Sequence, residues 1–415
     1  MTKKSDAPAI RFKGFSDAWE QRKLASLCEK FTDGDWIESK DQSDFGVRLV
    51  QTGNVGVAEY LDKPNNKKWI SEDTFDRLHC EEVLPGDILI SRLPEPAGRA
   101  CIMPLLGAKM ITAVDCTIVR TAPDMSNKFL VQYLSSQAYF DDVNICLAGG
   151  TRQRISRGNL ANFDVPIPVK KSEQDAIGMF FGYLDNLITL HQRKFEKLTN
   201  VKKSMLEKMF PQNGSSYPEI RFKGFTDPWE QRKLGDIADI VGGGTPSTGN
   251  QSYWDGDIDW YAPAEIADQI YANSSQKKIT GLGYENSSAK MLPPGTVLFT
   301  SRAGIGKTAI LTRKGCTNQG FQSIVPHRGE LDSYFIFSRT GELKRYGELV
   351  GAGSTFVEVS GKQMAVMELM MPPTMREQQT IGGFFQQLDH LITLHQRELE
   401  KLQNIKKSML EKMFV

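Results

Sequence analysis

The chain lacks the features of a membrane protein or of a disulfide-bonded secreted domain. None of its apolar runs reaches the roughly 18 residues that a membrane-spanning helix needs, and its first residues contain no apolar signal-peptide core. Six cysteines are scattered over 415 residues without a Cys-x-x-Cys pair. This spacing suits reduced thiols and specifies no zinc site. We therefore expect a cytoplasmic protein.

Motifs of common catalytic sites are also missing. The sequence has no His-Glu-x-x-His or Gly-x-Ser-x-Gly segment and no clustered carboxylates for two metal ions. Residues 301–308 look like a phosphate-binding loop, but Ser301 stands where the first glycine is required. Residues 351–353 lack the third glycine of a dinucleotide fingerprint. We expect no catalytic residue, no metal and no cofactor on this chain.

The sequence also has almost no excess of one charge over the other. The 51 Lys and Arg residues oppose 50 Asp and Glu residues, so the formal net charge is +1. A nucleic-acid partner would therefore have to be held by local basic patches. With 40% hydrophobic and 24% charged residues, the composition is that of an ordinary globular protein. Its length allows more than one hydrophobic core.

Two internal repeats dominate what is present. Residues 184–210 return as residues 388–414 with 22 of 27 positions identical, and residues 10–24 return as residues 220–234 with 13 of 15 identical. We call the second repeat the IRFKGF motif. The chain is therefore two tandem units, for which we expect a body domain at 1–169, a long helix at 170–210, a linker at 211–219, a second body domain at 220–373 and a second long helix at 374–415.

The first repeat has the pattern of a long amphipathic helix. Its apolar residues recur at three- and four-residue steps without Gly or Pro, which indicates a coiled-coil-like seam. About 40 such residues form a helix of about 60 Å, whose apolar stripe needs a partner. We expect the two helices to pair antiparallel. The predicted pairing and partner-interface residues are Leu184, Leu187, Ile188, His191, Phe195, Leu198, Met205, Leu388, Leu391, Ile392, His395, Leu399, Leu402 and Met409.

Solvent-side positions of the two helices also match. Glu196, Lys197, Lys202 and Lys203 correspond to Glu400, Lys401, Lys406 and Lys407, although packing alone leaves exposed positions free to differ. Either both helices present one surface to two copies of a partner, or the duplication is recent or maintained by recombination. The two seam histidines are expected to be packing residues, because no ligand pattern surrounds them.

The two bodies align only in islands. Each has a β-like run after Pro-Gly, at residues 85–92 and 294–302, followed by a Gly-rich loop with a basic residue. Short β-branched and aromatic segments broken by Gly, Asn and Pro predict mixed, β-rich domains with a few helices. The expected fold class is α+β, with two such domains and two long antiparallel helices that form a coiled-coil rod in a pseudo-twofold tandem repeat.

Basic, amide and hydroxyl side chains gather in the Gly-rich loops. Arginine can bond to both O6 and N7 of guanine and glutamine to adenine, each good pair contributing about 1–3 kcal/mol of discrimination, while hydroxyls bind phosphates. The alternative is a solvated loop whose arginines pair with acidic residues. The predicted DNA-binding residues are Arg92, Arg99, Thr151, Arg152, Gln153, Arg154 and Arg157 in the first body, and Thr245, Arg302, Lys307, Gln319, Gln322, Ser354, Thr355 and Lys362 in the second.

The arrangement resembles the DNA-specificity subunits of type I restriction-modification systems over essentially the whole chain. The resemblance rests on two divergent bodies alternating with two near-identical helices, and on residues 184–198, 202–210, 243–247 and 318–321. It implies that each body is a target-recognition domain docking in the major groove at half of a bipartite site. It also implies that the helices set the half-site spacing and hold two methylation subunits, which restriction subunits with translocase and nuclease activity join. S-adenosylmethionine, ATP and Mg would be bound by those partners.

Some expectations also follow from the pattern itself. An antiparallel helix pair presents the two bodies to DNA in inverted orientation, about one or so helical turns of ~34 Å apart. Because the bodies differ, the half-sites should differ. The near-zero net charge predicts weak, strongly salt-dependent DNA binding by the isolated chain. A specificity subunit of a methylation-only assembly, and a two-headed protein scaffold without a DNA role, remain as alternatives.

Overall fold

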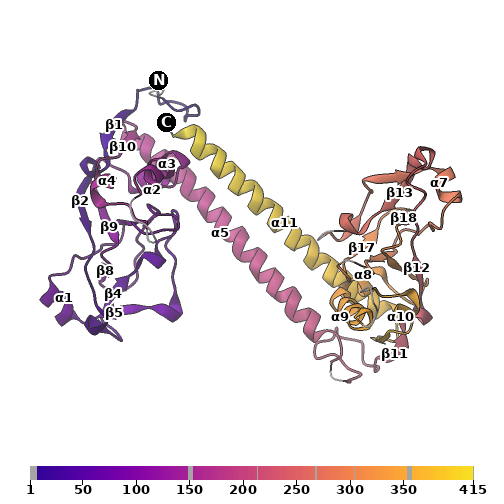
Figure 1. Ribbon diagram of the computed structural model, residues 1–415. Helices are drawn as coiled ribbons and strands as arrows, with labels where there is room; N and C mark the ends of the chain where they lie inside the picture. The colour runs from indigo at the N-terminus through magenta and orange to yellow at the C-terminus, as the bar shows by residue number, and fades with distance from the viewer. Residues whose placement is uncertain are drawn as a thin grey trace. The chain divides into compact units, whose positions relative to one another are not determined.

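The chain folds into two compact units. The first comprises residues 1–192 with 397–415, and the second comprises residues 193–396. The computed structural model, drawn in Figure 1, describes residues 7–147, 153–212, 214–266, 269–302, 304–352 and 358–414. Each unit thus contains one body and one part of each long helix.

Both predicted long helices are present. Helix α5 spans Lys171–Lys208 and helix α11 spans Met375–Met413. No proline interrupts either helix, and each carries a glutamate in its first turn, where the helix dipole favours negative charge. Pro211 follows the end of α5 and cannot continue it. In the described ranges, no helix is both long and apolar enough to cross a membrane.

The first body contains two four-stranded sheets. One has the order β2-β9-β6-β7, and the other has the order β3-β5-β4-β8. All pairings in the first sheet are antiparallel, whereas β4 and β8 are parallel. The strands of the two sheets are β2 (Cys28–Asp33), β6 (Ile88–Ser91), β7 (Ala100–Ile102), β9 (Cys116–Thr121), β3 (Gln42–Ser43), β4 (Val47–Val50), β5 (Lys68–Ile70) and β8 (Met110–Thr112).

The second body repeats this plan. Its larger sheet has the order β12-β19-β16-β17-β14 and its smaller sheet the order β15-β13-β18. Four consecutive strands of the larger sheet reproduce the order of β2-β9-β6-β7. The strands are β12 (Ala238–Gly242), β14 (Tyr271–Ala272), β16 (Val297–Phe299), β17 (Thr308–Leu311), β19 (Gln322–Pro326), β13 (Trp254–Tyr261), β15 (Lys277–Ile279) and β18 (Cys316–Thr317). The α+β prediction is confirmed.

Short helices and one further strand pair complete each body. Strand β1 (Glu20–Lys23) pairs with β10 (Asp164–Ile167), as β11 (Glu230–Lys233) pairs with β20 (Glu368–Met371). The α-helices are α1 (Glu72–Leu78), α2 (Asn127–Tyr133), α3 (Gln137–Ile145), α4 (Arg157–Ala161), α6 (Leu234–Ile237), α7 (Gly281–Glu285), α8 (Ser333–Ser338), α9 (Thr340–Gly351) and α10 (Gly361–Ala365). Short 3-10 turns are η1 (Leu24–Leu27), η2 (Ser39–Asp41), η3 (Thr52–Asn54), η4 (Pro64–Asn66), η5 (Gln251–Tyr253) and η6 (Pro263–Glu265).

The IRFKGF motif ties the start of one long helix to the end of the other. In the first unit, the Ile10 N–H donates to the Lys412 carbonyl (2.9 Å), and Arg11 forms a two-point ion pair with Glu173 at 2.6 and 2.7 Å. The hydrogen bond that Arg11 donates to the Glu173 carboxylate raises the pKa of Arg11. The second unit repeats the ion pair between Arg221 and Glu377 at 2.7 and 2.8 Å. This contact explains why the motif accompanies each helix.

Within each unit the long helices run antiparallel. In the first unit, the Phe414 ring, directly after α11, lies 5.8 Å from that of Phe181 in the first half of α5. In the second unit, Phe210, near the end of α5, lies 6.0 Å from Phe385 in the first half of α11. The Lys202–Asp389 ion pair at 2.6 Å, like the Lys406–Asp185 pair, joins the helices between these rings and the unit boundary. The antiparallel prediction is confirmed.

The predicted seam residues are buried to different degrees. Leu184, Leu388 and Leu399 are buried, whereas Leu391 is 40% exposed. Leu198 and Met205 pack against the second unit's core, and Leu402 and Met409 against the first unit's. The remaining residues are half-buried: Leu187, Ile188, His191, Phe195, Ile392 and His395. The residue-level assignment of the partner interface stays a prediction.

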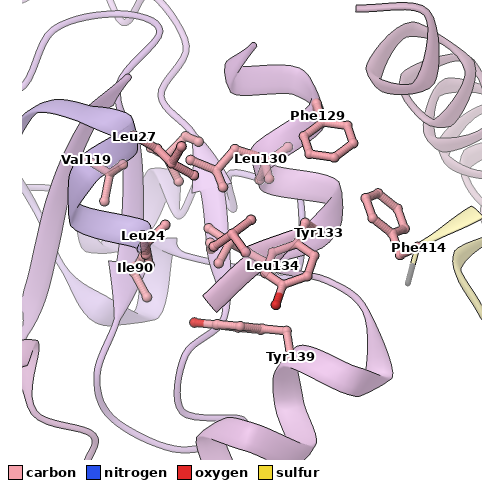
Figure 2. Packing of buried hydrophobic residues seen from close by; sticks show 14 of the residues in the cluster. Leu24, Leu27, Ile90, Val119, Phe129, Leu130, Tyr133, Leu134, Tyr139 and Phe414 are labelled. Carbon is pink, nitrogen blue, oxygen red and sulfur yellow. The ribbon is translucent and has the colours of Figure 1, made fainter. Parts of the chain in front are cut away.

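The C-terminus of the chain completes the first core. Figure 2 shows the Phe414 ring facing Phe129 and Tyr133, in a cluster that also includes Leu24 and Ile90. In the second unit the same place is taken by Phe210, which packs on Trp229 and Phe335. A glycine in each long helix lets a short helix of the body approach it closely. A Cβ on Gly178 of α5 would lie 2.7 Å from the backbone of Phe129 in α2, and one on Gly382 of α11 would lie 3.0 Å from the backbone of Phe335 in α8.

Candidate nucleic-acid interface

Four of the predicted residues that the structure describes in the first unit, Arg92, Gln153, Arg154 and Arg157, lie at one end of its β2-β9-β6-β7 sheet. Strand β2 ends at Asp33, opposite Thr117 near the start of β9, and β6 ends at Ser91, opposite Cys116. The Ile155 N–H donates to the Arg92 carbonyl (3.1 Å) and brings the loop before α4 to the same end. The sheet and α4 thereby position the side chains that the sequence had singled out.

Three arginines surround two carboxylates at this end. The buried Arg92 donates to the Val114 carbonyl (2.6 Å) and lies 3.5 Å from Asp33 and 3.9 Å from Asp115. Arg154 lies 3.8 Å from Asp115, and Arg157 lies 3.9 Å from Asp33, with side chains 62% and 46% exposed. Exposed ion pairs with such long distances contribute little to the free energy of folding. Arg154 and Arg157 can therefore turn toward an anionic ligand with little loss of free energy. The acidic pairing that we had kept as the alternative is present as well.

Arg99 has a different role. Its guanidinium donates to four backbone carbonyls, those of Thr52, Val55, Leu93 and Pro96, at 2.6–3.0 Å. Burial lowers its pKa. Four of its five N–H groups are thereby used, so the main role of Arg99 is to hold the loop. We therefore leave the half-buried Arg99 and the buried Arg92 out of the residues for which we propose base contacts.

The second unit has the same framework at the equivalent end. The Val359 N–H donates to the Ser301 carbonyl (3.1 Å), as Ile155 does to Arg92. Ser360 caps α10 as Ser156 caps α4, because each side chain accepts a hydrogen bond from a backbone N–H three residues later. These bonds align Ile155 and Ser156 with Val359 and Ser360, although the segments around them share almost no sequence.

The side chains at these aligned positions differ. Arg154 corresponds to Glu358, which pairs with Arg302 at 2.7 Å, and Thr117 corresponds to Gln322, since each faces the last residue of the neighbouring strand. Nearby, the hydroxyl of Thr245 is hydrogen-bonded to Gln319. Lys307 and Lys362 are exposed and form no ion pair within the described part of the chain. One scaffold thus presents two different sets of polar groups.

Some predicted positions lie outside the described residues, namely Thr151, Arg152, Ser354 and Thr355. Gln153 is exposed beside Arg154. Contact with DNA stays a prediction for every residue of the set. Sequence reasoning missed Asp33 and Asp115. No His, Cys, Asp and Glu cluster with metal-binding geometry was found in the described ranges.

The long helices carry a second matched feature, a shallow groove on each. The two grooves have volumes of about 520 and 540 Å³. Their lining residues are equivalent and differ only at Val201 and Ile405. The groove on α5 is lined by Arg193, Glu196, Lys197, Asn200, Val201, Ser204 and Met205, and that on α11 by Arg397, Glu400, Lys401, Asn404, Ile405, Ser408 and Met409.

Comparisons with known proteins agree with this architecture. Residues 16–200 and 226–404 match the family model described as the type I restriction modification DNA specificity domain. The type I restriction enzyme MjaIX specificity subunit of Methanocaldococcus jannaschii is 34% identical over 190 residues, which is 45% of this chain and 44% of that protein. The putative MjaX specificity subunit of the same organism is 22% identical over 405 residues, 94% of this chain and 92% of that protein.

A solved structure shares the fold. The S subunit of a type I restriction-modification system from M. genitalium superposes with a TM-score of 0.64 at 14% identity, over 99% of both chains. The two segments that match the family model include both bodies and most of both long helices. The chain therefore belongs to the type I restriction-modification DNA specificity family.

Proposed function

We propose that this chain is the non-catalytic subunit that gives a methyltransferase and restriction complex its DNA sequence specificity. Each unit binds one half of a bipartite, asymmetric site. The observation that carries the proposal is the contrast between aligned positions: the loops at the sheet ends carry unlike polar groups, whereas the residues that line the two helix grooves are identical except for one Val–Ile pair. Two different DNA half-sites and two copies of one partner would require this pattern.

The helix grooves support the partner assignment. Each groove presents the same cations, carboxylate and apolar floor to solvent, so one partner surface fits both. We assign these two seats to two methylation subunits, which restriction subunits with translocase and nuclease activity join. S-adenosylmethionine, ATP and Mg then belong to the partners. This chain's own residues select the sequence and position those subunits on it.

A salt titration on duplex DNA tests the proposal. The target is first identified by methylome sequencing of cells that express this chain with its partners. Affinity for that duplex and for a scrambled duplex is then measured by fluorescence anisotropy, with and without the methylation subunit. We expect sequence-dependent binding that strengthens with the methylation subunit and weakens steeply with salt. Equal affinity for both duplexes in both states would favour a protein scaffold, and methylation without nuclease activity would favour a methylation-only assembly.

Replacing one exposed arginine in each unit by alanine should show which unit binds which half-site. Arg154→Ala is expected to relax base choice in the first half-site only, and Arg302→Ala in the second only, because each arginine lies at the sheet end of its own unit. Loss of a good arginine–guanine contact lowers discrimination by about 1–3 kcal/mol. Binding to duplexes mutated in one half at a time measures this effect. Equal loss in both halves after either change would show that the arginines act elsewhere.

Reversing one charge in each groove tests the two seats. Lys197→Glu should remove one methylation subunit, Lys401→Glu should remove one, and the double variant should remove both, because the grooves are equivalent and each contains one of these lysines. Native mass spectrometry of the purified complex reports the subunit count. Lys197→Arg keeps the charge and serves as the control. Retention of two subunits by the double variant would place the seats elsewhere.

A further inference from the structure

A large aromatic side chain is exposed near the arginine cluster of the first unit. Trp36 is 71% exposed, although the backbone on either side of it is fixed. The Asp35 N–H donates to the Thr112 carbonyl (2.9 Å), and the Asp35 carboxylate accepts from the Glu81 N–H (3.0 Å). On the other side, Ile37 packs against the core of the second sheet. The exposure of Trp36 therefore results from a well-held local structure.

The second unit identifies the equivalent position. Gly34 and Gly243 each pass so close to a neighbouring strand that a Cβ would lie within 2.6 Å of two backbone carbonyl oxygens. The next residues then form matching bonds, Asp35 N–H to Thr112 and Gly244 N–H to Thr317 at 2.8 Å. Trp36 therefore occupies the place that Thr245 occupies in the second unit. Thr245 is one of the predicted DNA-binding residues.

The position also lies beside the arginine cluster. Trp36 follows Asp33 by three residues, a distance of at most about 11 Å along an extended chain. The Asp33 carboxylate is the one that Arg92 and Arg157 approach. Trp36 and Arg157 are therefore both close to Asp33, one along the chain and one through its ion pair. Arg154 and Arg157 have side chains that are 62% and 46% exposed, so they are the cations here that a polyanion can reach, among the carboxylates of Asp33, Asp35 and Glu38.

We propose that Trp36 contacts DNA directly and places its indole against the sugars and base edges of the first half-site. This inference rests on the proposed function and adds an apolar contact to it. An indole buries a large apolar area, and the Trp36 N–H already donates to the Glu38 carboxylate. Apolar groups in the major groove read the thymine methyl group. The first unit thus uses an aromatic contact at the position where the second unit offers a hydroxyl.

The test compares variants of the full chain assembled with its methylation subunit. Trp36→Ala should weaken binding of the specific duplex about tenfold, within the range of aromatic–base contacts, and Trp36→Phe should recover most of the loss. The dependence of affinity on salt should keep its slope, because no charge is removed. A duplex with a scrambled first half should bind wild type and Trp36→Ala equally. Tryptophan fluorescence of the wild-type complex should fall when DNA is added. The fall should be smaller in Trp36→Phe, which lacks this indole.

Leu105→Ala is the matched control. Leu105 is also strongly exposed in the first body, but it follows β7, whose last residue pairs with the first residue of β6, at the sheet end away from Arg92. This control should bind DNA as wild type does. Wild-type affinity in Trp36→Ala, or loss of the methylation subunit with unchanged DNA affinity of the remaining complex, would overturn the inference and leave the proposed function standing. Absence of sequence-dependent binding in the wild-type complex would overturn both.

Discussion

Replacing Phe414 by alanine is expected to lower the free energy of unfolding of the first unit by about 3–5 kcal/mol, the usual cost of removing a buried phenylalanine. The ring is 7% exposed and lies 5.3 Å from Phe129, 5.8 Å from Phe181, 6.0 Å from Tyr133 and 6.4 Å from Trp19. These residues come from the IRFKGF motif, α2 and α5. One side chain near the end of the chain therefore joins three separate segments.

Hydrogen exchange measured by mass spectrometry reports the two units separately. In Phe414→Ala the amides of α2 and of the first half of α5 should exchange faster, while the second unit keeps its protection. Phe210→Ala is the matched variant and should reverse the pattern, because Phe210 packs on Trp229, Phe335 and Phe385. Phe45→Ala, at a strongly exposed position, should change stability by less than about 0.5 kcal/mol. Equal protection in Phe414→Ala and wild type would contradict the anchoring role.

The long helices were predictable because their signal is local and repeated. Three- and four-residue spacing without proline fixes a helix, and near-identity of the two copies favours mutual pairing. The sequence did not predict which unit the rings of Phe210 and Phe414 pack into. Phe414 completes the first unit and Phe210 the second, an exchange that depends on antiparallel packing and on the position of the IRFKGF motif. Leu391 was among the predicted pairing residues but is exposed, because the spacing of apolar residues alone does not set the rotation of a helix about its axis.

At the candidate site, residue type was more informative than residue role. Arg154 and Arg157 emerge near one another, as a local run of arginines suggests. Arg99 belongs to the same chemical class, yet its donors are satisfied by carbonyls that come from segments up to 47 residues away. Asp33 and Asp115 are far apart in sequence and meet only through the pairing of β2 with β9 and of β6 with β9. Long-range strand pairing of this kind has no local signature.

The ion pair between the IRFKGF motif and the long helix carries the second large effect. Glu377 is almost fully buried and accepts two bonds from Arg221 and one from the Trp229 indole at 3.2 Å. Glu377→Ala leaves a largely buried guanidinium without its partner, which costs about 3–5 kcal/mol. The loss should appear as a lower free energy of unfolding of the second unit in urea titrations. Replacing both partners, in Arg221→Met with Glu377→Leu, should recover most of it, since apolar substitutes for a buried pair are often neutral.

The first unit offers a natural comparison. Glu173 holds Arg11 in the same two-point geometry, but the Trp19 indole nitrogen has no hydrogen-bond partner in the described part of the chain. Glu173→Ala should therefore cost about 1 kcal/mol less than Glu377→Ala, the typical contribution of one hydrogen bond. Because Arg11 and Arg221 fasten each motif to the first turn of a long helix, either change should also loosen the contact of that motif with the end of the other helix. Faster exchange at the Ile10 amide in Glu173→Ala, and at the Ile220 amide in Glu377→Ala, would show this directly, whereas unchanged exchange at both amides would mean that the motif is held by its apolar contacts alone.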